Sequence, residues 1–168
     1  VIDFTIPDAT QKHAEIASNT GCALIVGTTG MEESHQAALL SASNNVPIVV
    51  APNMSAGVNL LFAITQQVAQ TLGEDFDIEI IEMHHKHKID SPSGTALGLG
   101  EAAAKGRRID FNRSKVLSRE GIIGERKTGD IGFATLRGGD VVGDHTVVFA
   151  GAGERIEISH KATDRAIF

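Results

Sequence analysis

A run of histidines and lysines near the middle of the chain is the densest group of residues that could do chemistry. It reads Glu82-Met83-His84-His85-Lys86-His87-Lys88-Ile89-Asp90 and holds three of the seven histidines. Histidine titrates near neutral pH and can act as a general acid. Lysine supplies a positive charge for an anionic substrate. This combination suits the reduction of an imine or another unsaturated group, where the atom beside the reduced carbon must receive a proton.

Two other interpretations of this run remain open. His84, His85 and His87 could ligate a divalent metal, although the interspersed lysines would repel a dication and no cysteine lies nearby. The run could also be a polar loop with solvated charges. Because so many titratable groups fall together, we predict a catalytic site here and no metal.

A segment rich in hydroxyls follows directly, Asp90-Ser91-Pro92-Ser93-Gly94-Thr95. It precedes a helical pattern, so Ser93, Gly94 and Thr95 fall at a helix start beside the histidines. The first N–H groups of a helix have no intrahelical partner and lie at the positive end of its dipole, which makes them an anion site. The alternative is simple N-capping by one of the serines, and the two interpretations are compatible.

Two loops in the first third of the chain could bind a cofactor. Gly27-Thr28-Thr29-Gly30 and Ala51-Pro52-Asn53-Met54-Ser55 each follow a predicted strand. In an open α/β sheet, ligands bind at the carboxyl ends of parallel strands. Small residues there could contact a phosphate or a nicotinamide ribose. The alternative is two ordinary strand-to-helix turns, and the sequence holds no G-x-G-x-x-G fingerprint.

The elements that position these motifs follow from hydrophobic periodicity. In the first third we expect strands at 1–5, 23–26 and 46–50 and helices at 7–19 and 32–43. Strands that alternate with helices at this spacing predict a parallel sheet with right-handed crossovers. Pro7 suits the first turn of its helix, and Gly21 suits the C-cap.

The pattern changes after residue 56. We expect helices at 57–72 and 95–105 and strands at 76–83, 131–136, 141–149 and 155–160. The last three strands are separated by glycines and have no helical period, so they predict an antiparallel or mixed sheet. The fold class is therefore α/β, with a parallel sheet in the first part of the chain, an antiparallel or mixed sheet in the second, and a boundary near residues 53–56.

Composition excludes several classes of protein. The 15 Lys and Arg residues against 21 Asp and Glu residues give a net charge of −6, which argues against a basic nucleic-acid-binding face. The single cysteine excludes an internal disulfide and favours a reducing compartment, the cytoplasm. No continuous apolar run approaches the roughly 18 residues of a membrane span. Both ends of the chain fall in apolar runs, so we expect it to be part of a longer protein.

The run from Glu82 to Ala96 closely resembles the signature of the bacterial dihydrodipicolinate reductase family, whose members act in the diaminopimelate and lysine pathway. The resemblance extends over the whole chain. Further segments are similar to those of the family in the same order: Asp3-Phe4-Thr5, Gly27-Thr28-Thr29-Gly30, Ala51-Pro52-Asn53, Ser118-Arg119-Glu120-Gly121 and Gly132-Phe133-Ala134-Thr135.

The resemblance implies a role for each matching residue. His84 would be the proton donor and Lys88 the second catalytic residue. The residues implied to bind the dicarboxylate substrate are His85, Ser93, Gly94 and Thr95. Those implied to contact NADH or NADPH are Gly27, Thr28, Thr29, Ala51, Pro52, Asn53 and Met54. The activity implied is the reduction of 4-hydroxy-tetrahydrodipicolinate to tetrahydrodipicolinate.

The resemblance also carries expectations about assembly and about the ends of the chain. It implies a partial doubly wound, Rossmann-like nucleotide domain at residues 1–53 and an α+β substrate domain with a mixed sheet at 54–168. It also implies a homotetramer joined through the sheets of the C-terminal domains. Because cofactor and substrate would then sit on different domains, we expect closure about residues 53–56 before chemistry. The family's glycine-rich fingerprint and the residue that helps choose NADH or NADPH would precede Val1. We therefore expect this chain alone to bind cofactor poorly and to be inactive. A non-catalytic NAD-linked sensor and a metal-binding module built on the three histidines remain the alternative functions.

Overall fold

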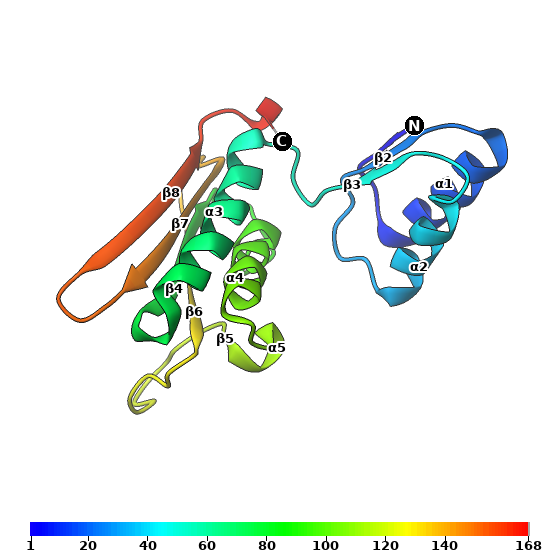
Figure 1. The fold of residues 1–168 in the computed structure, drawn as a ribbon. Coiled ribbons are helices and arrows are strands. Elements are labelled where there is room, and N and C mark those ends of the chain that lie inside the picture. The colour runs from blue at the N-terminus through cyan, green and yellow to red at the C-terminus, as the bar shows by residue number, and fades with distance from the viewer. Residues whose placement is uncertain (168) are drawn as a thin grey trace. The chain divides into compact units, whose positions relative to one another are not determined.

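The computed structural model describes residues 1–167 and divides into two compact units, Val1–Met54 and Ser55–Phe168 (Figure 1). Each unit has its own hydrophobic core, and each is described here by itself. Within the described residues, no helix is both long and apolar enough to cross a membrane.

The first unit is a small parallel sheet with two helices. Its strands are β1 (Ile2–Asp3), β2 (Leu24–Val26) and β3 (Ile48–Val50), in the order β1-β2-β3 and all parallel. Helices α1 (Pro7–Thr20) and α2 (Glu33–Ala42) connect them. Ala14 and Ala17 of α1, Leu39 of α2 and Leu24 and Val26 of β2 share one core. The predicted parallel sheet and Rossmann-like character are confirmed, although β1 is shorter than the strand predicted at 1–5.

Local signals explain where α1 begins and ends. Pro7 occupies the first turn, where its missing N–H costs nothing. Gly21 ends the helix in the left-handed conformation, with φ 71°, and donates its backbone N–H to the carbonyl of Ala17. Both positions agree with the sequence prediction.

The second unit places helices against one face of a five-stranded sheet (Figure 1). Its helical elements are α3 (Ala56–Leu72), η1 (Gly73–Asp75), α4 (Gly94–Arg107), α5 (Phe111–Ser114) and η2 (Arg165–Ile167). Its strands are β4 (Asp77–His84), β5 (Lys115–Val116), β6 (Ile131–Arg137), β7 (Gly143–Ala150) and β8 (Arg155–Ala162). The short elements α5 and β5 were not predicted, because four or fewer residues carry too little periodicity to be recognised.

The sheet of the second unit is mixed, as predicted. Its order is β5-β6-β4-β7-β8, and β4 runs parallel to β6 but antiparallel to β7. Helices α3 and α4 pack closely: a Cβ added at Gly106 of α4 would lie 2.3 Å from the carbonyl oxygen of Gln66 in α3. This contact holds the last turn of α4 against α3.

Strand β4 alternates between two environments. Ile78 and Ile80 lie in the core beneath the helices, and Glu82 and His84 continue the same buried face toward the end of the strand. The opposite face of the sheet has no helix over it in Figure 1, and Ile81 and Leu136 are 37% and 49% exposed there. The period of two residues along β4 thus carries a carboxylate and an imidazole to the helix-covered side.

Candidate active site

The site begins with a buried carboxylate–imidazole pair at the end of β4. Oε2 of Glu82 lies 2.5 Å from Nδ1 of His84, and the two residues are only 1% and 8% exposed. They are two positions apart on a strand, so their side chains share one face. Gly143 of β7 leaves room for the ring, because a Cβ there would lie 3.0 Å from Nε2 of His84.

Arg137 of β6 holds Glu82 from the neighbouring strand. It is the register partner of His84, and its Nη1 and Nη2 donate to Oε2 and Oε1 of Glu82 at 2.8 and 2.9 Å. The backbone N–H of Ser93 also donates to Oε1, at 3.1 Å. Burial raises the pKa of Glu82, but the hydrogen bonds from Arg137, His84 and Ser93 outweigh it, so the pKa lies below its usual value. Glu82 is therefore a carboxylate at neutral pH.

The ionisation of His84 is balanced between opposing effects. Burial lowers its pKa most, the hydrogen bond and charge of Glu82 raise it, and the charges of Lys88 and Arg137 lower it again. The net pKa lies below the usual value, so the imidazole is mainly neutral in the unliganded protein. A bound anion would favour its protonated form. Because Glu82 contacts Nδ1, Nε2 is the nitrogen that can exchange a proton with a ligand.

Ser93 joins the start of α4 to the site. Its Oγ accepts a hydrogen bond from the backbone N–H of Ala96 at 3.1 Å and lies 3.0 Å from Nε2 of His145 in β7. Either group can be the donor in the contact between Ser93 and His145, because the hydroxyl has a second lone pair and a neutral imidazole nitrogen can donate or accept. Both the Oγ and the N–H of Ser93 thus have protein partners, which leaves Gly94 as the exposed residue at the helix start.

His145 is a neutral histidine in the structure. Burial, followed by the charge of His84, lowers the pKa of His145 from 6.5 to about 4. Its ring lies edge-on to that of His84, with centroids 5.1 Å apart. Its Nδ1 is buried without a hydrogen-bond partner among the described residues.

The depressed pKa of His145 predicts a loss of stability in mild acid. Unfolded protein takes up a proton near pH 6.5, whereas the folded protein does so only near pH 4. The contribution of neutral His145 to the free energy of unfolding is therefore fully present above pH 6.5. It falls by up to about 3 kcal/mol as the pH drops to 4. Urea unfolding at a series of pH values should show a shallower decline for His145→Gln than for the parent protein. Parallel pH curves for the two proteins would contradict the assignment.

Lys88 lies in the turn that follows β4. Its Nζ pairs with Oδ1 of Asp90 at 2.8 Å, and its backbone N–H donates to the carbonyl of His85 at 3.2 Å. Asp90 is 53% exposed in this pair, so the bond is weak and a substrate carboxylate could replace it. A hollow of about 560 Å³ adjoins this turn, lined by His85, Lys86, His87, Gly139, Asp140 and Arg165. Its charged lining residues are two cations, Lys86 and Arg165, and one anion, Asp140.

The structure therefore brings together the predicted residues of the second unit. His84 ends β4, His85 and Lys88 form the following turn, and Ser93, Gly94 and Thr95 begin α4. No group of three His, Cys, Asp or Glu within residues 1–167 is arranged to hold a metal ion. The alternative of a metal site at His84, His85 and His87 thus has no support from the geometry.

The two predicted cofactor loops of the first unit leave the same edge of its sheet. Gly27 follows β2 and Ala51 follows β3, and the preceding residues Val26 and Val50 are register partners. Glycine is required at position 27 because the ring of Phe4 packs against its backbone, and a Cβ there would lie 2.1 Å from that ring. The remaining residues of the loops range from half-buried to exposed, except Thr28 and Ser55, which are buried.

Thr28 has a structural role that the sequence did not reveal. The residue is 4% exposed, and its hydroxyl accepts from the backbone N–H of Thr5 at 3.0 Å and from the hydroxyl of Thr10 at 2.9 Å. The network includes Asp3. Burial raises the pKa of Asp3, but hydrogen bonds from Thr5, Thr10 and His13 lower it by more, so the pKa lies below its usual value. The side chain of Thr28 thus braces the loop, and only its backbone is left to contact a cofactor.

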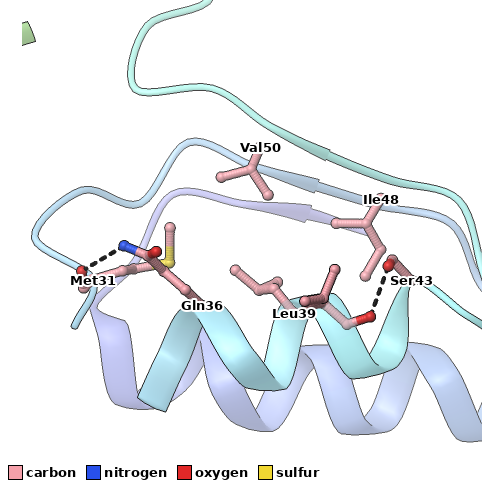
Figure 2. Close-up of a pocket in the computed structure, with 7 residues that line it drawn as sticks. Met31, Gln36, Leu39, Ser43, Ile48 and Val50 are labelled. Atoms are coloured by element: carbon pink, nitrogen blue, oxygen red, sulfur yellow. Dashed lines mark hydrogen bonds between the residues drawn. The ribbon is translucent and has the colours of Figure 1, made fainter. Parts of the chain in front are cut away.

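A separate hollow of about 450 Å³ lies between α2 and β3 (Figure 2). Its lining consists of Met31, Gln36, Leu39, Leu40, Ser43, Ile48 and Val50. The polar groups there are bonded to nearby carbonyls: Gln36 donates to Met31 at 3.3 Å and Ser43 to Leu40 at 2.7 Å. None of the predicted cofactor residues lines this hollow, so it is not the site that the sequence predicted.

Sequence reasoning missed three residues of the site. Glu82 lies within the run of histidines and lysines but is given no role there, and Arg137 and His145 lie far from that run along the chain. One signal was available for Glu82: it continues the buried face of Ile78 and Ile80, and a charge at such a position requires a partner. Nothing in the sequence pairs β6 with β4, so the partner itself could not be named.

The fold and the site together define the class of protein, a two-unit α/β protein that carries an acid–base centre beside a lysine and a helix start. Residues 57–168 match the family model described as dihydrodipicolinate reductase, C-terminus, and residues 1–54 match dihydrodipicolinate reductase, N-terminus. The chain belongs to the dihydrodipicolinate reductase family, as the sequence resemblance predicted.

Curated relatives and a solved structure agree with this assignment. The chain is 56% identical over 168 residues to 4-hydroxy-tetrahydrodipicolinate reductase of Rhodopseudomonas palustris strain HaA2 and 55% identical to that of Cereibacter sphaeroides strain KD131. These alignments cover 100% of the chain but 62% of each relative, so the chain spans under two thirds of their length. A dipicolinate-bound dihydrodipicolinate reductase from Paenisporosarcina sp. TG-14 aligns with TM-score 0.74 and 27% identity over 99% of this chain and 63% of that one.

Proposed function

We propose that this chain forms the substrate site and part of the cofactor site of a reductase that converts 4-hydroxy-tetrahydrodipicolinate to tetrahydrodipicolinate in diaminopimelate and lysine biosynthesis. The observation that carries the proposal is His84, held by Glu82 at 2.5 Å, beside Lys88 and the start of α4. The names of the curated relatives support the same substrate. Nothing in the geometry favours a sensor or a metal-binding module.

Each residue of the second unit has a distinct task in this proposal. His84 donates a proton from Nε2 to the atom beside the reduced carbon. Lys88 and the backbone N–H groups at the start of α4 hold the carboxylates, and His85 contacts the ring. Ser93 fixes the helix start through its bonds to Ala96 and His145. The cationic surroundings suit a doubly negative substrate.

The first unit would hold the cofactor. Its two edge loops offer small residues and exposed backbone at Thr29 and Gly30, which fits one part of a dinucleotide. NADH or NADPH, when bound, would supply the hydride. We assign the contacts to Gly27, Thr28 and Thr29 in one loop and to 51–54 in the other, with Thr28 acting through its backbone.

We also propose that the working assembly is a homotetramer in the cytoplasm. The face of the second unit's sheet that lies away from α3 and α4 exposes aliphatic side chains, including Ile81 and Leu136. A second copy of this chain would cover them and remove them from water. The net charge of −6 argues against a nucleic-acid partner.

Lys88→Ala is the variant that tests the substrate site. It should weaken dipicolinate binding by about 10- to 100-fold, the loss expected when one charge-assisted hydrogen bond of about 1.5–3 kcal/mol disappears. Turnover should fall as well, because Lys88 also positions the ring. The measurement is calorimetric titration of dipicolinate and steady-state reduction with NADPH, in a full-length protein that carries these 168 residues.

Lys86→Ala is the matched control for this experiment. It removes the same charge two positions away, from an exposed side chain, and should change neither quantity by more than about threefold. Equal effects of the two variants would mean that only the net charge of the loop matters. An unsubstituted protein that fails to reduce the substrate would refute the proposed function itself.

A further inference from the structure

We propose that Glu82, clamped by Arg137, is a positioning residue that fixes the tautomer of His84 and keeps its Nε2 available as the proton donor. The inference rests on the proposed function for its catalytic consequence. The arrangement of hydrogen bonds around Glu82 carries it, and this arrangement can be tested without any assay of activity.

The two carboxylate oxygens of Glu82 face four donors. Oε2 lies against Nδ1 of His84 and Nη1 of Arg137, while Oε1 accepts from Nη2 of Arg137 and the backbone N–H of Ser93. A carboxylate has about four lone-pair positions, so the set is complete. An ionised carboxylate cannot donate, and therefore the proton of a neutral His84 must reside on Nδ1.

Only one of the groups around Glu82 could reverse its role. A guanidinium and a backbone N–H are donors at every accessible pH, whereas a neutral imidazole nitrogen can donate or accept. If an amide replaced the carboxylate, its NH₂ group would be favoured on the side of His84. The Oε1 position faces two obligatory donors, whereas the Oε2 position faces His84 and one obligatory donor, Nη1 of Arg137. The histidine would then accept at Nδ1 and carry its proton on Nε2.

The charges around His84 explain why Glu82 matters for the proton as well as for the tautomer. Arg137 from β6 and Lys88 from the following turn oppose a positive imidazole, and His145 from β7 is neutral. Among these neighbours, Glu82 is the one that supplies a negative charge, and Ser93 of α4 contributes only a hydroxyl and an N–H. Without that charge, His84 would be protonated at lower pH than in the parent protein.

Glu82→Gln in a full-length protein carrying these residues is the decisive variant. Turnover at neutral pH should fall about 10- to 100-fold, the range found when a carboxylate that orients a metal-ligating histidine is removed. KM should change by less than about threefold, because Glu82 is buried behind His84. The falling limb of the pH profile of kcat/KM should move to lower pH, since a group that must be protonated has lost its counter-charge.

Glu79→Gln is the matched control. Glu79 lies on the same strand and is likewise held by arginines, with Arg119 at 2.8 Å and Arg126 at 3.0 Å, but it is on the opposite face of the sheet. The substitution Glu79→Gln should leave the pH profile and turnover unchanged. A shift of the same size in both variants would show that any lost strand carboxylate has this effect and would overturn the proposal.

Nitrogen-15 NMR of the His84 ring provides a test that needs no variant and no activity. In the 168-residue chain, neutral His84 should carry its proton on Nδ1, and in Glu82→Gln on Nε2. A neutral His84 with its proton on Nε2 in the unsubstituted chain would overturn the inference, even if Glu82→Gln did not fold. Parent turnover and an unshifted pH profile for Glu82→Gln would overturn it also. An inactive parent with the proton on Nδ1 would instead refute the proposed function and leave the positioning role of Glu82 supported.

Discussion

Replacing His84 with alanine is expected to lower turnover by about two to four orders of magnitude, the usual contribution of a general acid. The imidazole is held at Nδ1 by Glu82, so its loss removes the one proton donor aligned by the site. Binding of dipicolinate should change by less than about tenfold, because the carboxylates are held by Lys88 and the start of α4. Steady-state reduction and calorimetric titration of the same full-length protein separate the two quantities.

His87→Ala is the control for this prediction. His87 is three residues further on and exposed, and no hydrogen bond links it to Glu82 among the described residues. Its loss should leave turnover within about threefold of the parent value. If His84→Ala turned over at the parent rate, another residue would be the proton donor. Equal losses in the two variants would point instead to a general effect of the histidine run.

Arg137→Met is expected to lower the free energy of unfolding by about 3–5 kcal/mol, the cost of leaving a buried charge without its partner. Glu82 is 1% exposed and would keep only His84 and one backbone N–H. The effect should be strongest near neutral pH, where Glu82 is ionised, and should diminish in acid as the carboxyl becomes protonated. Urea unfolding followed by circular dichroism measures it.

Two further variants test whether the lost stability of Arg137→Met comes from the unpaired charge of Glu82 or would follow the removal of an arginine elsewhere in the sheet. Arg119→Met removes a guanidinium that is 31% exposed and paired with Glu79, and it should cost less than about 1 kcal/mol. The double variant Glu82→Leu with Arg137→Met removes both charges and should recover much of the lost stability. A single variant Arg137→Met as stable as the parent would show that Glu82 does not depend on its clamp.

Most of the fold could be predicted because it follows from local patterns. The alternation of apolar strands with helical periods in the first 50 residues is enough to predict a parallel sheet. The glycine-separated runs after residue 130 indicate strands but not their partners. That β6 lies parallel beside β4, while β7 lies antiparallel on its other side, depends on tertiary packing that the sequence pattern does not express.

The site was predicted only in the part that is continuous in sequence. His84, Lys88 and Ser93 fall within one short run, so their proximity follows from the chain itself. Arg137 and His145 reach the same place through the register of two other strands, which places them beside His84 and Glu82 respectively. Such partners are invisible to reasoning along the chain.

Thr28 is a residue whose side chain the sequence suggests for ligand binding but which has a structural role instead. A threonine in a glycine-rich loop at a sheet edge suggests a hydroxyl offered to a ligand. The structure instead directs this hydroxyl inward to Thr5 and Thr10. Small polar residues brace a loop as readily as they bind a cofactor, and their type alone does not distinguish the two.

A crystal structure of the full-length protein with dipicolinate and nucleotide tests the central claim most directly. We expect one carboxylate within about 3 Å of Nζ of Lys88 and of the backbone N–H groups that begin α4, with Nε2 of His84 against the ring. Nδ1 of His84 should keep its contact with Glu82. Dipicolinate bound away from Lys88 and the start of α4, or a His84 ring turned so that Nδ1 faces the ligand, would contradict the account.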